Sequence, residues 1–206
     1  MLGQIIAIDI GGTNIRAGTL EDRDEPRYLT STPTARSDIQ STLATAVSAV
    51  VADLKTPLAG IIVGCPGLID RTGKVTAALY LDTVGLHVTR VLTSKFKVPV
   101  RTINDANLQA LALTDRITHG AYIVFGTGVG GAIISGSAVI DGTNGYAGEI
   151  GHMPVSGASN ICLCGRTGCL DTVASGFWLE RLLGPRWWDL GTLPAAANSA
   201  LADAGR

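Results

Sequence analysis

One histidine and three cysteines lie close together in the second half of this 206-residue sequence. They are His152, Cys162, Cys164 and Cys169. One imidazole and three thiolates form a complete ligand set for tetrahedral Zn²⁺, with no coordination position left for a water molecule. The spacing therefore predicts a structural zinc site, which holds a loop in shape and does not activate a water.

Two other interpretations of these cysteines remain open, namely ordinary buried thiols and a disulfide. The fourth cysteine, Cys65, lies far away in an apolar run. The N-terminus has no basic segment, and Asp9 interrupts its first apolar run, so we expect no signal peptide. Low cysteine usage with a single cluster is typical of a metal site in a reducing compartment, and we expect a cytoplasmic protein.

The predicted zinc loop begins directly after an acidic side chain. Glu149 and His152 share the segment Gly-Glu-Ile-Gly-His at 148–152. A metal that fixes a carboxylate and an imidazole in place indicates a binding site for a polar ligand nearby.

Two glycine-rich turns each separate a pair of strand-like runs. Residues 5–10 form an apolar run that contains Asp9, and a Gly-Gly turn and a second apolar run follow. Residues 126–131 repeat this design and formally match G-x-G-x-x-G. A Rossmann fingerprint must open a helix, but the apolar run at 132–135 favours a strand. We therefore expect two β-hairpins.

Glycine turns of this kind suit phosphate binding, because a phosphate can approach a backbone that carries no side chain. Two such turns can present backbone N–H groups to phosphates from two sides. The alternative is that Gly11 and Gly12 only make a turn. Asp9 argues against that alternative, since a carboxylate at the end of a buried strand is costly unless it meets a cation or water.

The sequence between the two turns has the pattern of an ordinary α/β protein. Apolar spacing predicts a helix over 37–54, opened by a capping box at Ser37, and a buried strand over 58–63. A strand over 98–103 leads into Asn104 and Asp105, and a helix follows. Asp105 is then either a helix cap or a general base at the carboxyl end of a strand, where α/β folds bind ligands.

The composition is that of a globular protein, with 46% hydrophobic and 16% charged residues. The net charge of −1 gives no basic surface for nucleic acid. No apolar run is long enough to span a bilayer. We therefore expect neither a nucleic acid nor a membrane as a partner.

Four motifs, taken in their order, resemble the ROK family of sugar kinases and sugar-responsive repressors. They lie at residues 7–14, 104–107, 126–131 and 148–169. The resemblance implies an α/β, actin-like (ribonuclease H-like) ATPase fold. It also implies an N-terminal lobe over 1–118 and a C-terminal lobe over 119–206, which is incomplete relative to the family.

The resemblance implies transfer of the γ-phosphoryl group of ATP, bound with Mg²⁺, to a hydroxyl of a hexose or N-acetylhexosamine. Asp105 would be the catalytic base. The implied sugar contacts are Asn104, Glu149, His152 and Asp171. The implied phosphate contacts are Asp9, Gly11, Gly12, Thr13, Asn14, Gly126, Thr127, Gly128, Gly130 and Gly131.

The sequence departs from the family pattern at several places. Asp171 stands where the family has Glu, Ala132 stands for a glycine, and the segment 78–86 lacks the usual Asn-Leu-x-x-Trp. The segment that packs on adenosine in the family is missing, so we expect weak ATP binding with little preference for the base. The Trp187–Trp188 pair is either a cover for apolar surface or part of a core.

Three functions are weighed for the chain. The first is an ATP-dependent sugar kinase that forms a homodimer. The second is a shortened, catalytically impaired fragment that binds sugar. The third is a sugar-sensing regulator without a DNA-binding domain, which the near-neutral charge and the early first strand disfavour.

Overall fold

The computed structural model describes residues 3–22, 25–35 and 38–184, so the Trp187–Trp188 pair lies outside the described residues. The largest unit is a five-stranded sheet in the order β3-β2-β1-β4-β7. Strand β2 is antiparallel to its neighbours β1 and β3, whereas β4 and β7 run parallel to β1. The strands are β1 (Gln4–Ile10), β2 (Asn14–Asp22), β3 (Glu25–Pro33), β4 (Leu58–Cys65) and β7 (Val100–Asn104).

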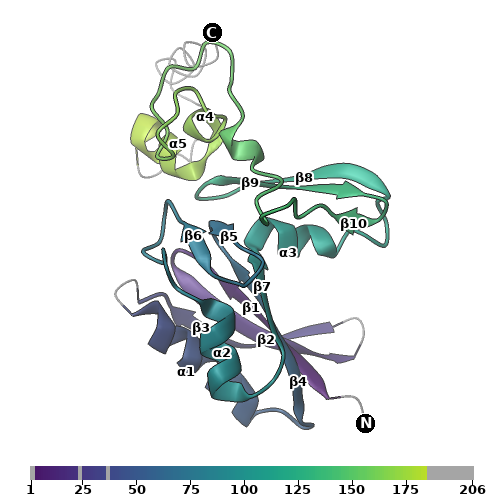
Figure 1. Ribbon diagram of the computed structural model, residues 1–206. Coiled ribbons are helices and arrows are strands. Elements are labelled where there is room, and N and C mark those ends of the chain that lie inside the picture. Colours follow the sequence, from purple (N-terminus) through teal and green to yellow (C-terminus); the bar gives the residue numbers. More distant parts are fainter. Residues whose placement is uncertain (1–2, 23–24, 36–37, 185–206) are drawn as a thin grey trace.

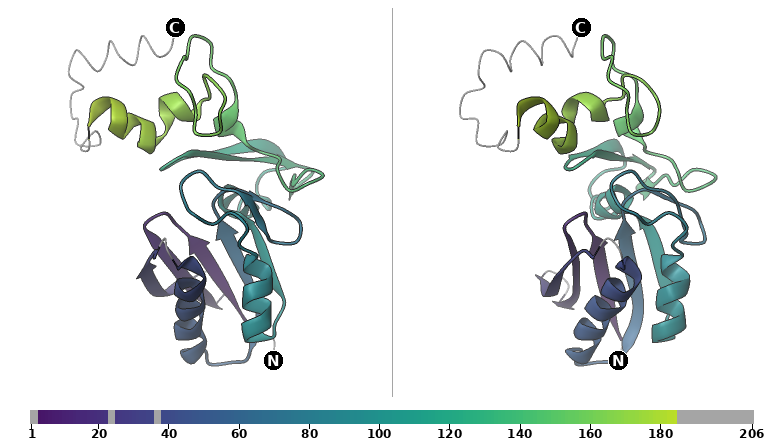
Figure 2. Two further views of the ribbon diagram at one scale, coloured as in Figure 1. Left: turned by 60° about the vertical axis from the view of Figure 1, so that its left-hand side comes forward. Right: turned by 90° about the vertical axis from the view of Figure 1, so that its left-hand side faces the viewer.

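Two helices cover one face of this sheet and lie side by side (Figure 2). They are α1 (Ile39–Ala52) and α2 (Val88–Phe96). The capping box predicted at Ser37 is wrong, because the N-cap of α1 is Asp38, whose carboxylate accepts a hydrogen bond from the N–H of Ser41. The core between the helices and the sheet contains fully buried aliphatic side chains, among them Ile6, Ile8, Leu43, Val47, Val63 and Leu92.

A second, smaller sheet lies beyond the carboxyl ends of β4 and β7, in the order β10-β9-β8 (Figure 1). Helix α3 (Asp105–Leu111) lies between the two sheets and contacts β4 and β7 on one side and β9 on the other. The small sheet consists of β8 (His119–Phe125), β9 (Val129–Ser135) and β10 (Ala138–Val139).

The polypeptide after β10 forms a long loop and two short helices at the end of the molecule far from the N-terminus (Figure 1). The loop carries the cysteine cluster. A separate two-stranded sheet precedes α2 in the sequence. The elements are the 3₁₀ turn η1 (Ile150–His152), α4 (Asp171–Ala174), α5 (Gly176–Leu183), β5 (Leu68–Ile69) and β6 (Val75–Ala77).

Both predicted hairpins are confirmed. Strands β1 and β2 pair antiparallel around the turn that begins at Gly11, with Ile10 opposite Ile15. Strands β8 and β9 do the same, with Phe125 opposite Val129. A strand and not a helix follows the second glycine turn, so the rejection of a Rossmann fingerprint is confirmed as well. The predicted actin-like α/β fold is confirmed, whereas the division between residues 118 and 119 stays a prediction.

Candidate functional site

A cleft of about 650 Å³ lies between the two glycine turns, the start of α3 and the cysteine-rich loop. It brings together most of the residues that the sequence singled out. These are Asp9, Gly11, Gly12, Asn104, Asp105, Gly126, Thr127, Gly128, Gly130, Gly131, Glu149, His152, Cys164 and Asp171. The predicted residues outside its lining are Thr13, Asn14, Cys162 and Cys169.

Asp105 is the first residue of α3 and faces this cleft. Its Oδ1 accepts a hydrogen bond of 3.0 Å from the N–H of Ala106. Burial raises the pKa of the carboxyl group, and the negative charge of Asp9 raises it further, against the hydrogen bond from Ala106. A carboxylate whose pKa is raised in a cleft is a candidate for proton transfer. Asp105 is not the cap of α3, because Asn104 fills that position.

Asn104 has both ends of its amide engaged by the protein. Its Oδ1 accepts a hydrogen bond of 3.1 Å from the N–H of Asn107, and its Nδ2 donates one of 3.1 Å to the carbonyl of Gly67. These bonds fix the junction between β7 and α3, and thereby the position of Asp105. The expected contact of Asn104 with a sugar stays a prediction.

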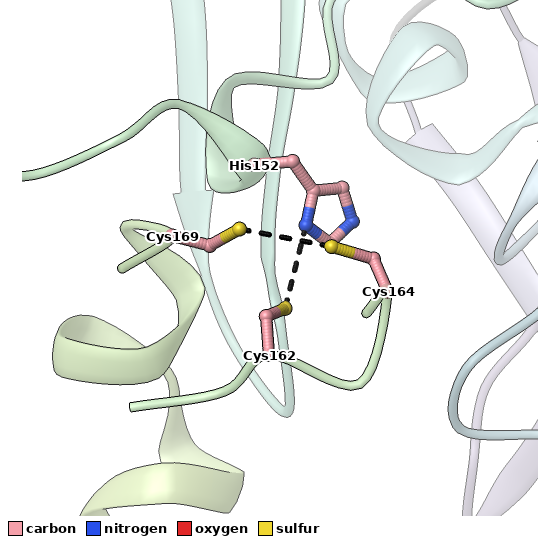
Figure 3. A group of neighbouring side chains, drawn as sticks. All are labelled: His152, Cys162, Cys164 and Cys169. Carbon is pink, nitrogen blue, oxygen red and sulfur yellow. Dashed lines mark hydrogen bonds between the residues drawn. The ribbon is translucent and has the colours of Figure 1, made fainter. Parts of the chain in front are cut away.

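The four side chains of the cysteine cluster point toward one another (Figure 3). The ligand atoms of His152, Cys162, Cys164 and Cys169 all lie within 4.8 Å of one another. Cys164 Sγ lies 3.7 Å from Cys169 Sγ, and Cys162 Sγ lies 3.7 Å from His152 Nδ1. Two thiolates bound tetrahedrally to zinc at about 2.3 Å lie about 3.8 Å apart. The donor set and its spacing therefore fit Zn²⁺.

The disulfide alternative is wrong for this chain, because all four cysteines lie in the described residues and are free. Cys65 takes no part in the cluster. It is the last residue of β4 and is fully buried, and burial, followed by the charge of Asp105, raises the pKa of its thiol to about 12.

The loop that carries the cluster packs closely on β9. Gly151 shows this best, because a Cβ atom at this position would lie 2.1 Å from the carbonyl oxygen of Val129. A hydrogen bond joins the two ends of this loop, since the N–H of Leu170 donates to the carbonyl of Met153 over 2.8 Å. The cysteine cluster is therefore held directly against the strand that follows the second glycine turn.

Glu149 and His152 lie at the boundary between the cluster and the cleft. The Nδ1 atom of His152 points to Cys162, while its Nε2 lies 3.9 Å from Glu149 Oε2. Burial, followed by the negative charge of Asp105, raises the pKa of Glu149 to about 7, against the positive charge of Arg166. Burial also lowers the pKa of His152. One imidazole nitrogen thus points to the cysteine cluster, and the other lies on the side of Glu149.

The second glycine turn is held by the segment just after the cluster. The N–H groups of Gly176 and Phe177 donate to the carbonyls of Gly126 and Thr127, over 2.8 and 3.0 Å. In the other direction, the N–H of Val129 donates to Asp171 Oδ1 over 2.8 Å.

Asp171 is buried, with 2% of its surface exposed, and its Oδ2 accepts a hydrogen bond of 2.6 Å from Tyr80. Each carboxylate oxygen thus already has a protein donor, and the expected sugar contact of Asp171 stays a prediction. Burial, followed by the bond to Asp171, raises the pKa of Tyr80, so its hydroxyl remains a donor. Sequence reasoning missed Tyr80, whose only signal was the departure of 78–86 from the family pattern.

Comparison with known proteins gives consistent matches. The model of the ROK family matches residues 5–197. An N-acetylmannosamine kinase of Shigella flexneri is 35% identical over 179 residues, which are 84% of this chain and 61% of that protein. The chain thus spans about 61% of the length of the curated relatives that it matches.

Solved structures agree with this result. A ROK family glucokinase from Streptomyces griseus, in complex with glucose and AMPPNP, has a TM-score of 0.77 and 28% identity, over 88% of this chain and 60% of that one. An inorganic polyphosphate/ATP-glucomannokinase from Arthrobacter has a TM-score of 0.66 and 26% identity, over 87% of this chain and 71% of that one. The part of the chain that the structure describes contains no helix long and apolar enough to cross a membrane.

Proposed function

The chain belongs to the ROK family, and from that premise we propose that it transfers the γ-phosphoryl group of ATP to a hydroxyl of a hexose or an N-acetylhexosamine. The observation that carries the proposal is the cleft itself. One cavity is lined by two glycine turns, by Asp105 and by the Glu149–His152 pair. Phosphoryl transfer needs groups that hold phosphates beside a carboxylate that accepts a proton. The relatives include a kinase for N-acetylmannosamine and a glucokinase that binds glucose and an ATP analogue.

Asp105 is the proposed base in this reaction. It accepts the proton of the attacking sugar hydroxyl as the oxygen forms its bond to the γ-phosphorus, while the bond from that phosphorus to the bridging oxygen breaks and ADP leaves. Its burial supports this role, because a carboxylate with a raised pKa is a stronger base than an exposed one. Asn104 holds Asp105 at the end of β7, and Gly64 on the neighbouring strand leaves room for the start of α3.

The sugar is proposed to lie against Asn104, Glu149, His152 and Asp171. Three of these residues lie close to the cysteine cluster in sequence, so the loop that the metal shapes also shapes the sugar site. Zinc at the four-residue cluster would act as a structural ion, because four protein ligands leave no open position. His152 would serve both sites, one ring nitrogen for each.

The phosphates are proposed to lie between the two glycine turns, with Mg²⁺ near Asp9. Mg²⁺ would neutralise charge on the phosphate oxygens. Asp9 forms a partly exposed ion pair of 3.4 Å with Arg16, and water-exposed pairs of this kind are weak enough to yield to a metal ion. The contacts proposed from the turns are the backbone groups at Gly11, Gly12, Thr13, Asn14, Gly126, Thr127, Gly128, Gly130 and Gly131.

A second donor is supported by one specific comparison. The glucomannokinase with a similar fold is named for both inorganic polyphosphate and ATP. Phosphate chains alone would satisfy two turns that bind through backbone groups, without any contact to a base. The proposal therefore includes inorganic polyphosphate as a donor to be compared with ATP. A cytoplasmic homodimer remains part of the proposal.

The deciding experiment is a turnover assay with ATP or polyphosphate against a panel of hexoses and N-acetylhexosamines. We expect formation of a sugar phosphate with at least one sugar, and turnover lower by about two to four orders of magnitude in the Asp105→Asn variant. Binding of a sugar without turnover by either donor would instead support the non-catalytic alternative. Binding of neither sugar nor donor would reject both.

A further inference from the structure

Tyr80 connects one wall of the cleft to the second glycine turn. It lies in the loop between β6 and α2 and lines the cleft. Its hydroxyl donates to Asp171 Oδ2 over 2.6 Å, and Asp171 Oδ1 accepts the N–H of Val129 over 2.8 Å. The buried carboxylate therefore joins a side chain of one wall to the backbone of the turn on the opposite wall.

The ring of Tyr80 makes contacts that lead to the same turn. It meets the ring of Phe177 edge to face, with 5.6 Å between the centroids. The N–H of Phe177 in turn donates to the carbonyl of Thr127. A Cβ atom at Gly128 would lie 2.8 Å from the Tyr80 ring, so the ring also lies directly against the turn. The hydroxyl group of Tyr80 is thus linked to the turn through Asp171, whereas its ring lies against the turn directly and contacts Phe177.

We propose that Tyr80 is a positioning residue for the phosphate-binding turn: through Asp171 it fixes the direction of the Val129 N–H group and the shape of residues 126–129. This inference rests on the proposed function in one respect, because it takes phosphate groups as the ligand of the turn. Its consequence is that the affinity for phosphates depends on the loop at 78–81. A sugar that moves this loop changes the affinity for the phosphoryl donor.

The chemistry of Asp171 explains why the hydroxyl matters. A buried carboxylate needs donors on both oxygens, and loss of one donor leaves a desolvated charge without a partner. Asp171 would then turn toward another donor or toward water. Since the same carboxylate holds the N–H of Val129, the turn loses its fixed position when the carboxylate moves.

The test uses Tyr80→Phe, which keeps the ring and removes the hydroxyl. We expect the Val129 amide to exchange with solvent about ten-fold faster, and Kd for Mg²⁺–tripolyphosphate to rise about ten-fold in calorimetric titration, as for a lost hydrogen bond to a charged group. The affinity for the sugar alone is measured beside it, because Asp171 is also a proposed sugar contact. Tyr122→Phe is the matched control. Tyr122 lies on β8, the strand that leads into the turn, and the change removes its hydroxyl bond of 2.7 Å to Gln109.

A double-mutant cycle with Asp171→Asn separates a positioning role from a direct one. If Tyr80 acts through Asp171, removal of the hydroxyl has little further effect once the carboxylate is gone, and the two effects are far from additive. Additive effects would overturn the inference, as would an unchanged Val129 amide or equal changes in the Tyr122→Phe control. If the parent chain binds neither tripolyphosphate nor sugar, the proposed function fails. The exchange rate of Val129 still decides the role of Tyr80 in that case.

Discussion

The two glycine turns look alike in sequence but are held in different ways. The first, between β1 and β2, is fixed by the residue that follows β3, because Thr34 donates its hydroxyl to the carbonyl of Gly11 and its N–H to the carbonyl of Thr13. It stands on the large core of the first sheet. The second, between β8 and β9, is fixed by the segment that follows the cysteine cluster.

The sheets behind the turns differ as well. The buried cluster of the small sheet is centred on Ala110, Ala132 and Ile134, and exposed apolar side chains lie along β8 and β9. Phe125 is 62% exposed and Ile123 is 44% exposed. The first turn thus has a large buried core below it in addition to its hydrogen bonds, whereas the second depends on hydrogen bonds from the loop that the metal is expected to shape. Removal of the metal should therefore loosen the second turn and leave the first unchanged.

Zinc removal is the change with the largest expected effect. We expect about one zinc per chain by elemental analysis, bound by the His152 cluster. Chelation should release the loop and the Val129 amide, while the amides of β1 and β4 keep their protection from exchange, because the binding energy of a structural zinc, about 10 kcal/mol or more, is folding energy of its own segment.

Cys162→Ser should reproduce the effect of chelation, and Cys65→Ala is its matched control. The control removes a buried thiol of the first core and leaves the zinc content unchanged. A metal-free chain with an unchanged second turn would contradict the difference drawn between the two turns.

Asp105→Asn should have the next largest effect, and it tests the proposed base, which lies in the cleft between the two turns. We expect turnover to fall by about two to four orders of magnitude, since the amide keeps the shape and loses the base. The affinity for the sugar and the exchange rates of both turns should stay close to those of the parent. Turnover near the parental rate would show that Asp105 only supports the start of α3.

The same variant should gain thermal stability at neutral pH. Burial raises the pKa of Asp105, so the folded chain disfavours the ionised form, and ionisation at neutral pH costs stability. Asn cannot ionise and removes that cost. The gain should therefore be present at pH 7 and vanish as the pH falls below the ordinary pKa of an aspartate, about 3.9. Thermal melts of both chains across this range measure it.

The sequence predicted the elements that have strong local signals. Apolar runs around glycines gave both hairpins, and a complete ligand set gave the cysteine cluster. It could not predict the pair of Tyr80 and Asp171, because these residues are 91 positions apart and meet only through the fold. The cap of α1 was placed one residue early, since Ser37 and Asp38 are both good cap residues by type, and Asp38 is the cap in the structure.

An added methyl group should lower the free energy of unfolding more in the second turn than in the first, and this effect is smaller than the preceding ones. Gly128→Ala places a Cβ atom 2.8 Å from the Tyr80 ring, and we expect a loss of about 1–3 kcal/mol together with faster exchange of Val129. Gly12→Ala is the matched change in the first turn, where a Cβ atom would meet nothing within 4 Å. Its effect on the free energy of unfolding should stay within about 0.5 kcal/mol. Chemical denaturation measures both, and equal losses would mean that the turns are equally crowded.

The smallest expected effect comes from Thr34→Val, which removes one hydroxyl that supports the first turn. The bond to the carbonyl of Gly11 is 2.7 Å long, and its loss should cost about 1 kcal/mol. Because β3 and the core below the turn remain, exchange should rise at Gly11–Asn14 and stay unchanged at Val129. Thr42→Val removes a similar hydroxyl bond to the carbonyl of Asp38 at the start of α1, a bond in which neither turn takes part, and should leave the exchange of both turns unchanged. A Thr34→Val chain that also loosens Val129 would show that the two turns move as one unit across the cleft, and that their supports are not independent.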